Sequence, residues 1–184
     1  DPDAAGQMAP LFHQGGVTKR YLAVVRGYAA TEGRIDHPLK RLASRRHPKA
    51  ADGPLQQAVT AYRRIGKIEL PFGVDRYPTS RYSLVALAPK TGRRHQLRRH
   101  MKHIAHPIIG DTCYGKGVHN RFFAEHLGCR GLLLTAVTLS FDHPLTGTRL
   151  RIRAPLPSHF EGLIQRLGWG ELCKSAYFGD VSNG

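Results

Sequence analysis

The sequence predicts an α+β domain with a mixed, largely antiparallel sheet and flanking helices. Several short segments alternate apolar with polar residues, turns containing Gly and Pro separate them, and only a few segments have helical spacing. Strands and helices do not alternate regularly along the chain, which argues against a parallel βαβ sheet. With 184 residues, 41% of them apolar, the chain suits a single domain, residues 1–184.

The strand signals are β-branched and aromatic residues, alternation, and Gly or Pro at the ends. They predict strands at residues 18–28, 33–39, 58–63, 81–88, 132–141 and 149–154. The last two flank a Pro- and Gly-containing connector, residues 142–147, and so predict a β-hairpin. Residues 40–54 are basic, contain prolines and lack an apolar period, so we expect a basic surface loop there.

Helical spacing is clearest in residues 93–104. Leu97, Met101 and Ile104 fall at i, i+4 and i+7, which predicts one buried stripe on a helix. Weaker patterns predict helices at residues 4–13, 120–127 and 158–167. The last of these opens with a capping-box pattern, Ser158 to Glu161.

The charge balance predicts a polyanionic partner. Lysine and arginine number 28 against 13 acidic residues, a net charge of +15. Cationic side chains gain affinity for nucleic acid by releasing condensed counterions, so RNA or DNA is the first candidate. A solvated basic surface, or a ribosomal or DNA-binding protein, would carry the same charge.

Other features constrain location and metal content. No apolar run approaches the roughly 20 residues needed to cross a bilayer, so we expect a cytoplasmic protein without membrane contact. Cys113, Cys129 and Cys173 have no C-x-x-C or paired His/Cys spacing, which indicates neither a disulfide framework nor zinc. The chain starts at Asp1 without methionine, which we interpret as an internal cut in a longer protein.

The densest chemical signal is a basic segment at residues 90–100. On a helix, Arg94, Arg98 and Lys102 would share one face at i, i+4 and i+8, and could project together toward a phosphate or carboxylate. Helix N-terminal amides near Thr91 and Gly92 would help to bind an anion. A solvated basic face is the other interpretation, and the pattern alone favours neither.

These segments resemble the RluA-type pseudouridine synthase family. Residues 91–98 (TGRRHQLR) are similar to its TGR-x-HQ-[IL]-R motif, and residues 106–115 (HPIIGDTCYG) to its HP-x-x-GD-x-x-YG turn. Residues 19–27 (KRYLAVVRG) resemble its K-x-Y-x-A-x-V-x-G strand, and residues 143–147 and 154–157 its closing hairpin. Residues 77–82 (YPTSRY) and the doubled arginine at 98–99 resemble the tRNA-modifying branch.

The resemblance implies a pseudouridine synthase catalytic-domain fold, incomplete at the N-terminus, and an isomerisation that needs no cofactor or metal. The uracil is detached from its ribose, turned and rejoined through C5. In the family an aspartate in an H-R-L-D-R motif initiates the reaction. This chain contains no such motif, so the nucleophile is expected upstream of Asp1 and residues 1–184 alone are expected to be inactive.

The resemblance also implies two catalytic residues. Tyr21 matches the tyrosine that stacks on the flipped base and is a candidate for deprotonating C5. Arg98 matches the arginine that pairs with the catalytic aspartate. Without the resemblance, Tyr21 would be interpreted as a core aromatic residue. The basic motif residues are expected to bind RNA: Lys19, Arg20, Arg93, Arg94, His95, Arg99 and Lys102.

Some neighbouring residues have simpler interpretations. Asp111 is expected to cap the turn at Gly110. His100, His103 and His106 spread around a helix too widely to share a metal ion, so RNA contact or solvent exposure is expected. Thr135 stands where the family has histidine, which puts one supporting contact in doubt.

Three functions stay open from the sequence. The first is a monomeric isomerase acting on a uridine in the T-stem/acceptor region of tRNA. The second is a basic RNA-binding module without catalysis, and the third is an isomerase of the same family acting on ribosomal RNA. Because A-form helices hide their base edges, target choice is expected to follow RNA shape and local opening.

Overall fold

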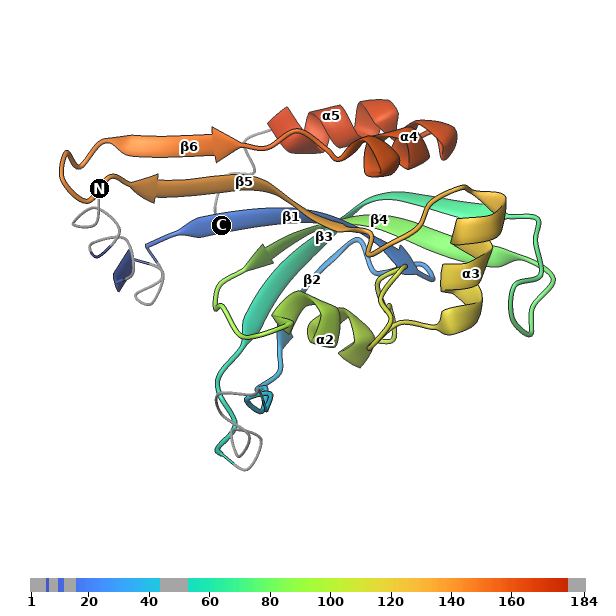
Figure 1. The fold of residues 1–184 in the computed structure, drawn as a ribbon, viewed down its shortest axis with the longest axis horizontal. Coiled ribbons are helices and arrows are strands. Elements are labelled where there is room, and N and C mark those ends of the chain that lie inside the picture. The colour runs from blue at the N-terminus through green and yellow to red at the C-terminus, as the bar shows by residue number, and fades with distance from the viewer. Residues whose placement is uncertain (1–5, 7–9, 12–15, 44–52, 179–184) are drawn as a thin grey trace.

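The fold is a six-stranded antiparallel sheet with helices on both faces (Figure 1). The computed structural model describes residue 6, residues 10–11, residues 16–43 and residues 53–178. The strand order is β2-β3-β4-β1-β5-β6. The elements are β1 Thr18–Arg26, β2 Glu32–Asp36, β3 Val59–Leu70, β4 Ser80–Pro89, α2 Gln96–His103, α3 Gly117–His126, β5 Leu134–Asp142, β6 Arg149–Arg153, α4 Ser158–Arg166 and α5 Gly170–Phe178.

Strand β1 lies inside the sheet, paired with β4 on one side and β5 on the other. Because side chains alternate across a strand, β1 contributes to both faces. Leu22 and Val24 belong to one buried cluster, whereas Ala23 and Val25 belong to a second. The apolar run that predicted this strand is thus divided between two cores.

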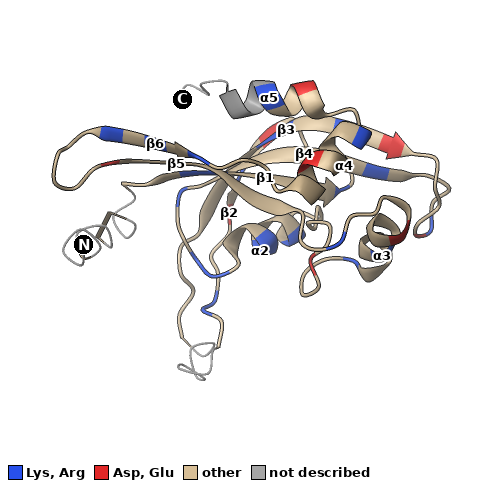
Figure 2. Ribbon diagram, turned by 45° about the horizontal axis from the view of Figure 1, so that its top comes forward, with Lys and Arg blue, Asp and Glu red and all other residues tan. Residues whose placement is uncertain are grey.

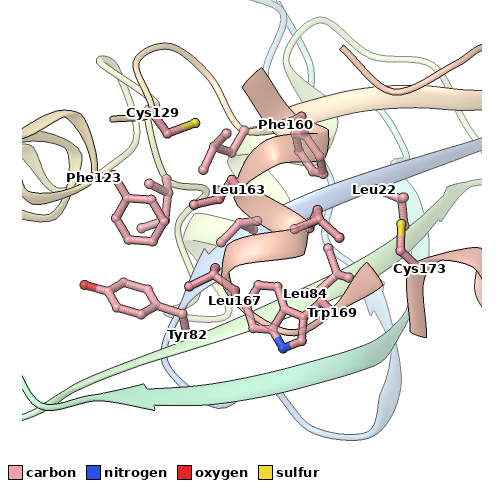
Figure 3. Packing of buried hydrophobic residues seen from close by; sticks show 14 of the residues in the cluster. Leu22, Tyr82, Leu84, Phe123, Cys129, Phe160, Leu163, Leu167, Trp169 and Cys173 are labelled. Carbon is pink, nitrogen blue, oxygen red and sulfur yellow. The ribbon is translucent and has the colours of Figure 1, made fainter. Parts of the chain in front are cut away.

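The larger core lies beneath α4 and α5 (Figure 3). Phe123 of α3, Leu163 of α4 and Trp169 pack there against β1 and β4. Strand β3 carries a register irregularity between Arg64 and Gly66. A Cβ at Gly66 would lie 2.8 Å from the Trp169 ring, so the indole packs against bare backbone.

The second core lies on the face covered by α2. Leu97 and Met101 of this helix pack with Ala23, Val25 and other residues of β1 and β4, as the predicted stripe requires. Ile104 is half-buried against the same cluster. Burial of this apolar stripe holds α2 across the sheet and thereby fixes where its basic residues lie.

The α+β class, the antiparallel sheet and each predicted strand are confirmed. Strand β3 runs to Leu70, well past the predicted end at residue 63, because it pairs with β4 along its whole length. Helix α5 was not predicted. Helix α4 is confirmed, but its capping box is wrong, since Pro157 is the N-cap residue and no side chain caps the helix. Residues 4–13 lie mostly outside the described residues, as do residues 44–52 of the predicted loop.

Within the described part of the chain, no helix has the length and apolar character needed to cross a membrane. The predicted hairpin is present as β5 and β6, paired from Thr138 to Asp142. Figure 2 shows basic residues on β6 and on α2.

Candidate active site

The turn that leads into α2 is fixed by the side chain of Gln96. Its Oε1 accepts hydrogen bonds from the Thr91 hydroxyl (2.7 Å) and the Arg93 backbone N–H (3.0 Å). Its Nε2 donates to the Val59 carbonyl and to Thr60 Oγ1, both at 3.0 Å. The buried amide is therefore fully used to join this turn to β3.

Thr60 of β3 also anchors the middle of α2. Thr60 donates its hydroxyl proton to His100 Nδ1 (2.9 Å), and His100 Nε2 donates to the His37 carbonyl (3.0 Å). His100 is completely buried, so the expectation of RNA contact or solvent exposure is wrong for it. Its role is structural, because burial of a polar ring requires hydrogen bonds at both nitrogens.

The residue before α2 has an unusual backbone. His95 has φ 55° and ψ 26°, the left-handed region that few non-glycine residues adopt. The conformation ends the turn and starts the helix at Gln96, so Arg93 and Arg94 precede the helix. Strained residues of this kind cluster at functional sites because the surrounding structure must hold them in place.

Arg98 makes the strongest polar contact of the site. Its Nε and Nη2 donate to the two carboxylate oxygens of Asp111, each at 2.7 Å. The Asp111 side chain is 0% exposed and that of Arg98 is 17% exposed. Two parallel charge-assisted bonds fix the guanidinium in one plane, which single-point contacts with a lysine could not do.

Asp111 is itself held by backbone. Its Oδ1 accepts hydrogen bonds from the N–H groups of Cys113 (2.9 Å) and Tyr114 (2.8 Å), so the predicted turn role is confirmed. Gly110 has φ +79°, and a Cβ there would overlap the Gly131 carbonyl oxygen, so glycine is required next to Asp111.

The electrostatics of this pair agree with its geometry. Burial by itself raises the pKa of Asp111, but the Arg98 and backbone hydrogen bonds outweigh it and leave the pKa below its ordinary value. The hydrogen bond to Asp111 raises the pKa of Arg98. Both groups are therefore charged near neutral pH.

Tyr114 forms the wall beside Arg98. The Arg98 guanidinium carbon is 5.1 Å from the centre of the Tyr114 ring, and the Lys102 ammonium is 5.9 Å from it. The Tyr114 hydroxyl lies 3.2 Å from His95 Nδ1. Burial, followed by the charges of Arg98 and Arg94, lowers the pKa of His95, so its imidazole is neutral near pH 7.

Tyr21 and Arg98 lie on the same face of the sheet. The half-buried Tyr21 packs against the cluster that contains Leu97, the neighbour of Arg98 on α2. Burial raises the pKa of Tyr21, so its phenol is protonated near neutral pH. A half-buried neutral phenol presents an aromatic surface suited to stacking on a base.

Lys19 lies on the same side as Tyr21, and its ammonium is 3.6 Å from the position of a Cβ on Gly92. The end of β1 therefore meets the turn before α2. Arg20 lies between Lys19 and Tyr21 in the strand, so alternation directs it to the opposite face. Lys19 and Tyr21 thus lie on the sheet face that α2 covers, and alternation along β1 directs Arg20 to the other face.

A basic cavity adjoins this turn. It has a volume of about 490 Å³, and its lining includes Lys40, Arg41, Arg93 and Arg94. Three arginines hold the neighbouring segments by donating to backbone carbonyls: Arg93 to Gln57, Arg94 to Ala43 and Arg99 to Lys40. A cavity lined by several cations suits phosphate groups.

The predicted common face of Arg94, Arg98 and Lys102 is wrong. Arg94 precedes the helix and turns toward Ala43, whereas Arg98 and Lys102 both lie against Tyr114. The prediction that Thr91 and Gly92 provide helix N-terminal amides is also wrong, because α2 begins at Gln96.

Three site residues were not predicted from the sequence: Gln96, Asp111 as the ion-pair partner of Arg98, and Tyr114. All three belong to the motifs at 91–98 and 106–115, and that membership was the available signal.

Comparison with known proteins places this fold in the pseudouridylate synthase class of RNA-modifying enzymes. The family model described as RNA pseudouridylate synthase matches residues 1–103. The chain is 48% identical over 172 residues to tRNA pseudouridine synthase C of Haemophilus ducreyi, covering 91% of this chain and 69% of that protein. It is 46% identical to tRNA pseudouridine synthase C of Vibrio cholerae, with 69% of that protein covered.

The chain belongs to the RNA pseudouridylate synthase family, and the RluA-type resemblance is confirmed. Human RNA Pseudouridylate Synthase Domain Containing 1 superposes with a TM-score of 0.64 at 26% identity, over 85% of this chain and 62% of that structure. Human RNA Pseudouridylate Synthase Domain Containing 4, at 24% identity and the same TM-score, shares the fold.

Proposed function

We propose that this chain is the RNA-binding and base-positioning part of a tRNA pseudouridine synthase. The observation that carries the proposal is the placement of Tyr21 and the bidentate Arg98–Asp111 pair on one face of the sheet. The relatives named tRNA pseudouridine synthase C and the net charge of +15 support tRNA as the substrate. The target proposed from this kinship is uridine 65 of tRNA.

In the proposed mechanism, Tyr21 stacks on the extruded uracil. Its phenol can accept the C5 proton after the base has been turned and rejoined, once a neighbouring base or water removes the phenolic proton. The protonated state of Tyr21 before RNA binds is compatible with stacking and requires such a proton exchange before the last step.

In the proposal, Arg98 orients the nucleophile while Asp111 holds Arg98 in place. Asp111 uses its Nε and one Nη2 proton, and the guanidinium has further N–H donors. Those donors can bind and orient the nucleophilic aspartate of the family's H-R-L-D-R motif. Asp111 thus acts as a positioning residue that presents Arg98 at a fixed angle.

The basic cavity beside residues 92–94 supplies the proposed phosphate contacts. Such contacts position an RNA without reading its bases, so target choice depends on the shape of the tRNA and on local opening of a stem. Extrusion of one base costs a few kcal/mol, which stacking on Tyr21 partly offsets.

The full-length enzyme tests this proposal. Tyr21→Phe and Arg98→Ala should each abolish pseudouridine formation in an unmodified tRNA transcript, with tRNA binding retained. Pseudouridine is measured by mass spectrometry of the digested tRNA, and binding by filter retention. Arg34→Ala is the control, since it removes an exposed arginine, paired with Asp36, from edge strand β2. Normal turnover by Tyr21→Phe or Arg98→Ala would refute the assigned roles.

A further inference from the structure

A second cavity lies at the far end of β1. It has a volume of about 560 Å³, within the range of small-ligand pockets. Arg26 ends β1 there, and His119 approaches from α3. Residue 75 and residues 77–79 of the β3–β4 connection, with the first two residues of β4, also line the cavity. Arg26 follows Tyr21 by about five residues, roughly 17 Å along a strand, and none of these residues takes part in the mechanism above.

Two buried nitrogen atoms beside this cavity have no hydrogen-bond partner among the described residues. They are Arg26 Nε and His119 Nε2. His119 is only 4% exposed. Buried polar atoms of this kind are rare in folded proteins, because each one costs the desolvation of the group without a compensating bond. Two of them, from β1 and α3, lie beside this one cavity.

Arg26 Nε is a donor, because arginine Nε always carries a proton. The buried Tyr82 hydroxyl lies 2.9 Å from His119 Nδ1. Burial and the nearby charge of Arg26 lower the pKa of His119 to about 4, so the ring is neutral near pH 7 and carries one proton on one of its two nitrogens. The missing partner of Arg26 Nε is therefore an acceptor oxygen.

The charges around the cavity favour an anion. Asp75 is its acidic lining residue, and it forms an ion pair with Lys116. The Arg26 guanidinium also forms an ion pair with Asp75, at 3.9 Å, which is too long for a hydrogen bond. Arg76 adds a further positive charge near Asp75. A phosphate group suits the positive charges of Arg26 and Arg76.

An aromatic side chain stands at the rim. Tyr77 is 65% exposed, although it is large and apolar, and the Arg76 guanidinium carbon is 6.0 Å from its ring centre. An exposed aromatic ring among arginines is the usual platform on which a nucleobase stacks. The cavity thus combines a phosphate position with a base position.

We infer that this cavity receives one nucleotide of the RNA substrate, other than the uridine that is isomerised. Its phosphate lies beside Arg26 and His119, and its base stacks on Tyr77. The inference rests on the proposed function, because the RNA chain is what supplies the nucleotide. It makes the β3–β4 connection a second point of RNA recognition, separated along β1 from Tyr21.

The test uses the full-length enzyme and the tRNA transcript that the wild type isomerises. Tyr77→Ala should raise KM for tRNA at least about fivefold, the lower end of base-stacking energies, with the effect on KM and not on kcat. Tyr77→Phe keeps the ring and should restore most of the binding. Arg26→Lys keeps the charge but lacks the Nε–H, and should raise KM by a similar factor. Arg34→Lys, the same change at an exposed arginine of edge strand β2, is the matched control.

Ultraviolet cross-linking locates the contact. Trypsin cleaves after Arg76 and Arg81, and the peptide of residues 77–81 should carry a nucleotide adduct. Suppose that the wild type is active, that Tyr77→Ala leaves KM for tRNA unchanged and that this peptide carries no adduct. The inference would then be overturned, whereas the proposed function would still stand. A wild type that neither binds nor isomerises tRNA would overturn both. If free uridine monophosphate protects this peptide as well as tRNA does, the pocket is a mononucleotide site and the inference fails.

Discussion

Helices α2 and α4 pack on the sheet in different ways. The buried residues of α4 are Phe160, Leu163 and Ile164, all apolar. The buried residues of α2 are Gln96, Leu97, His100 and Met101, of which half are polar and bound to β3. Buried polar groups contribute little net stability, but their directional hydrogen bonds fix the position of the helix that carries them. We conclude that α4 mainly stabilises the fold, whereas α2 mainly places Arg98.

The largest effect on stability is expected from a substitution in α4. Leu163→Ala removes a completely buried side chain from the larger core and should lower the free energy of unfolding by about 2–5 kcal/mol. Urea unfolding followed by circular dichroism measures the loss. Turnover per folded full-length molecule should stay at the wild-type level. A stability loss below about 1 kcal/mol would contradict the assignment of α4 as the stabilising helix.

The next effect is expected at Asp111. Asp111→Asn keeps the shape and the turn, but its amide N–H₂ faces the Arg98 Nε–H and cannot accept from it. Arg98 then loses a charge-assisted bond and its fixed plane, so kcat should fall about tenfold, equal to about 1.4 kcal/mol, with KM for tRNA little changed.

The control for this variant is Asp36→Asn, the same chemical change in the exposed pair with Arg34. Comparing kcat of the two variants distinguishes the effect of misplacing Arg98 from the effect of losing one negative charge. Wild-type kcat in Asp111→Asn would show that Asp111 serves only the turn.

The smallest effect is expected at the arginines that precede α2. Arg94 is exposed and lines the basic cavity, so Arg94→Ala should weaken tRNA binding about two- to threefold and reduce the salt dependence of binding by about one counterion. Binding measured over a series of salt concentrations tests this. Equal salt slopes for Arg94→Ala and the wild type would exclude a phosphate contact at Arg94.

Local sequence patterns predicted most of the fold. Strands β1 and β4 and the β5–β6 hairpin follow from alternation and turn residues, and α2 follows from its apolar stripe. The second half of β3 was missed because residues 64–70 contain glycine and charged residues, and the strand conformation of this segment depends on pairing with β4. Helix α5 lacks a strong apolar stripe, and Cys173 is buried there by contact with the larger core.

For the candidate site too, the sequence predicted some features and not others. Motif resemblance selected Tyr21 and Arg98, whose assigned roles remain predictions. It did not predict that Arg98 pairs with Asp111, thirteen residues later in the chain. Nor did it predict the unpartnered nitrogens of Arg26 and His119, which lie on β1 and α3.

The alternating strands, the amphipathic helix, the positive charge and the family could all be inferred from the amino-acid sequence, because each depends on residues close together in the chain or on their sum. The folded structure was needed to show which arginine meets a carboxylate, which histidine is buried and which buried nitrogens of the described residues lack partners. Those properties depend on distances between side chains from different elements, and they are set when the sheet and its helices pack.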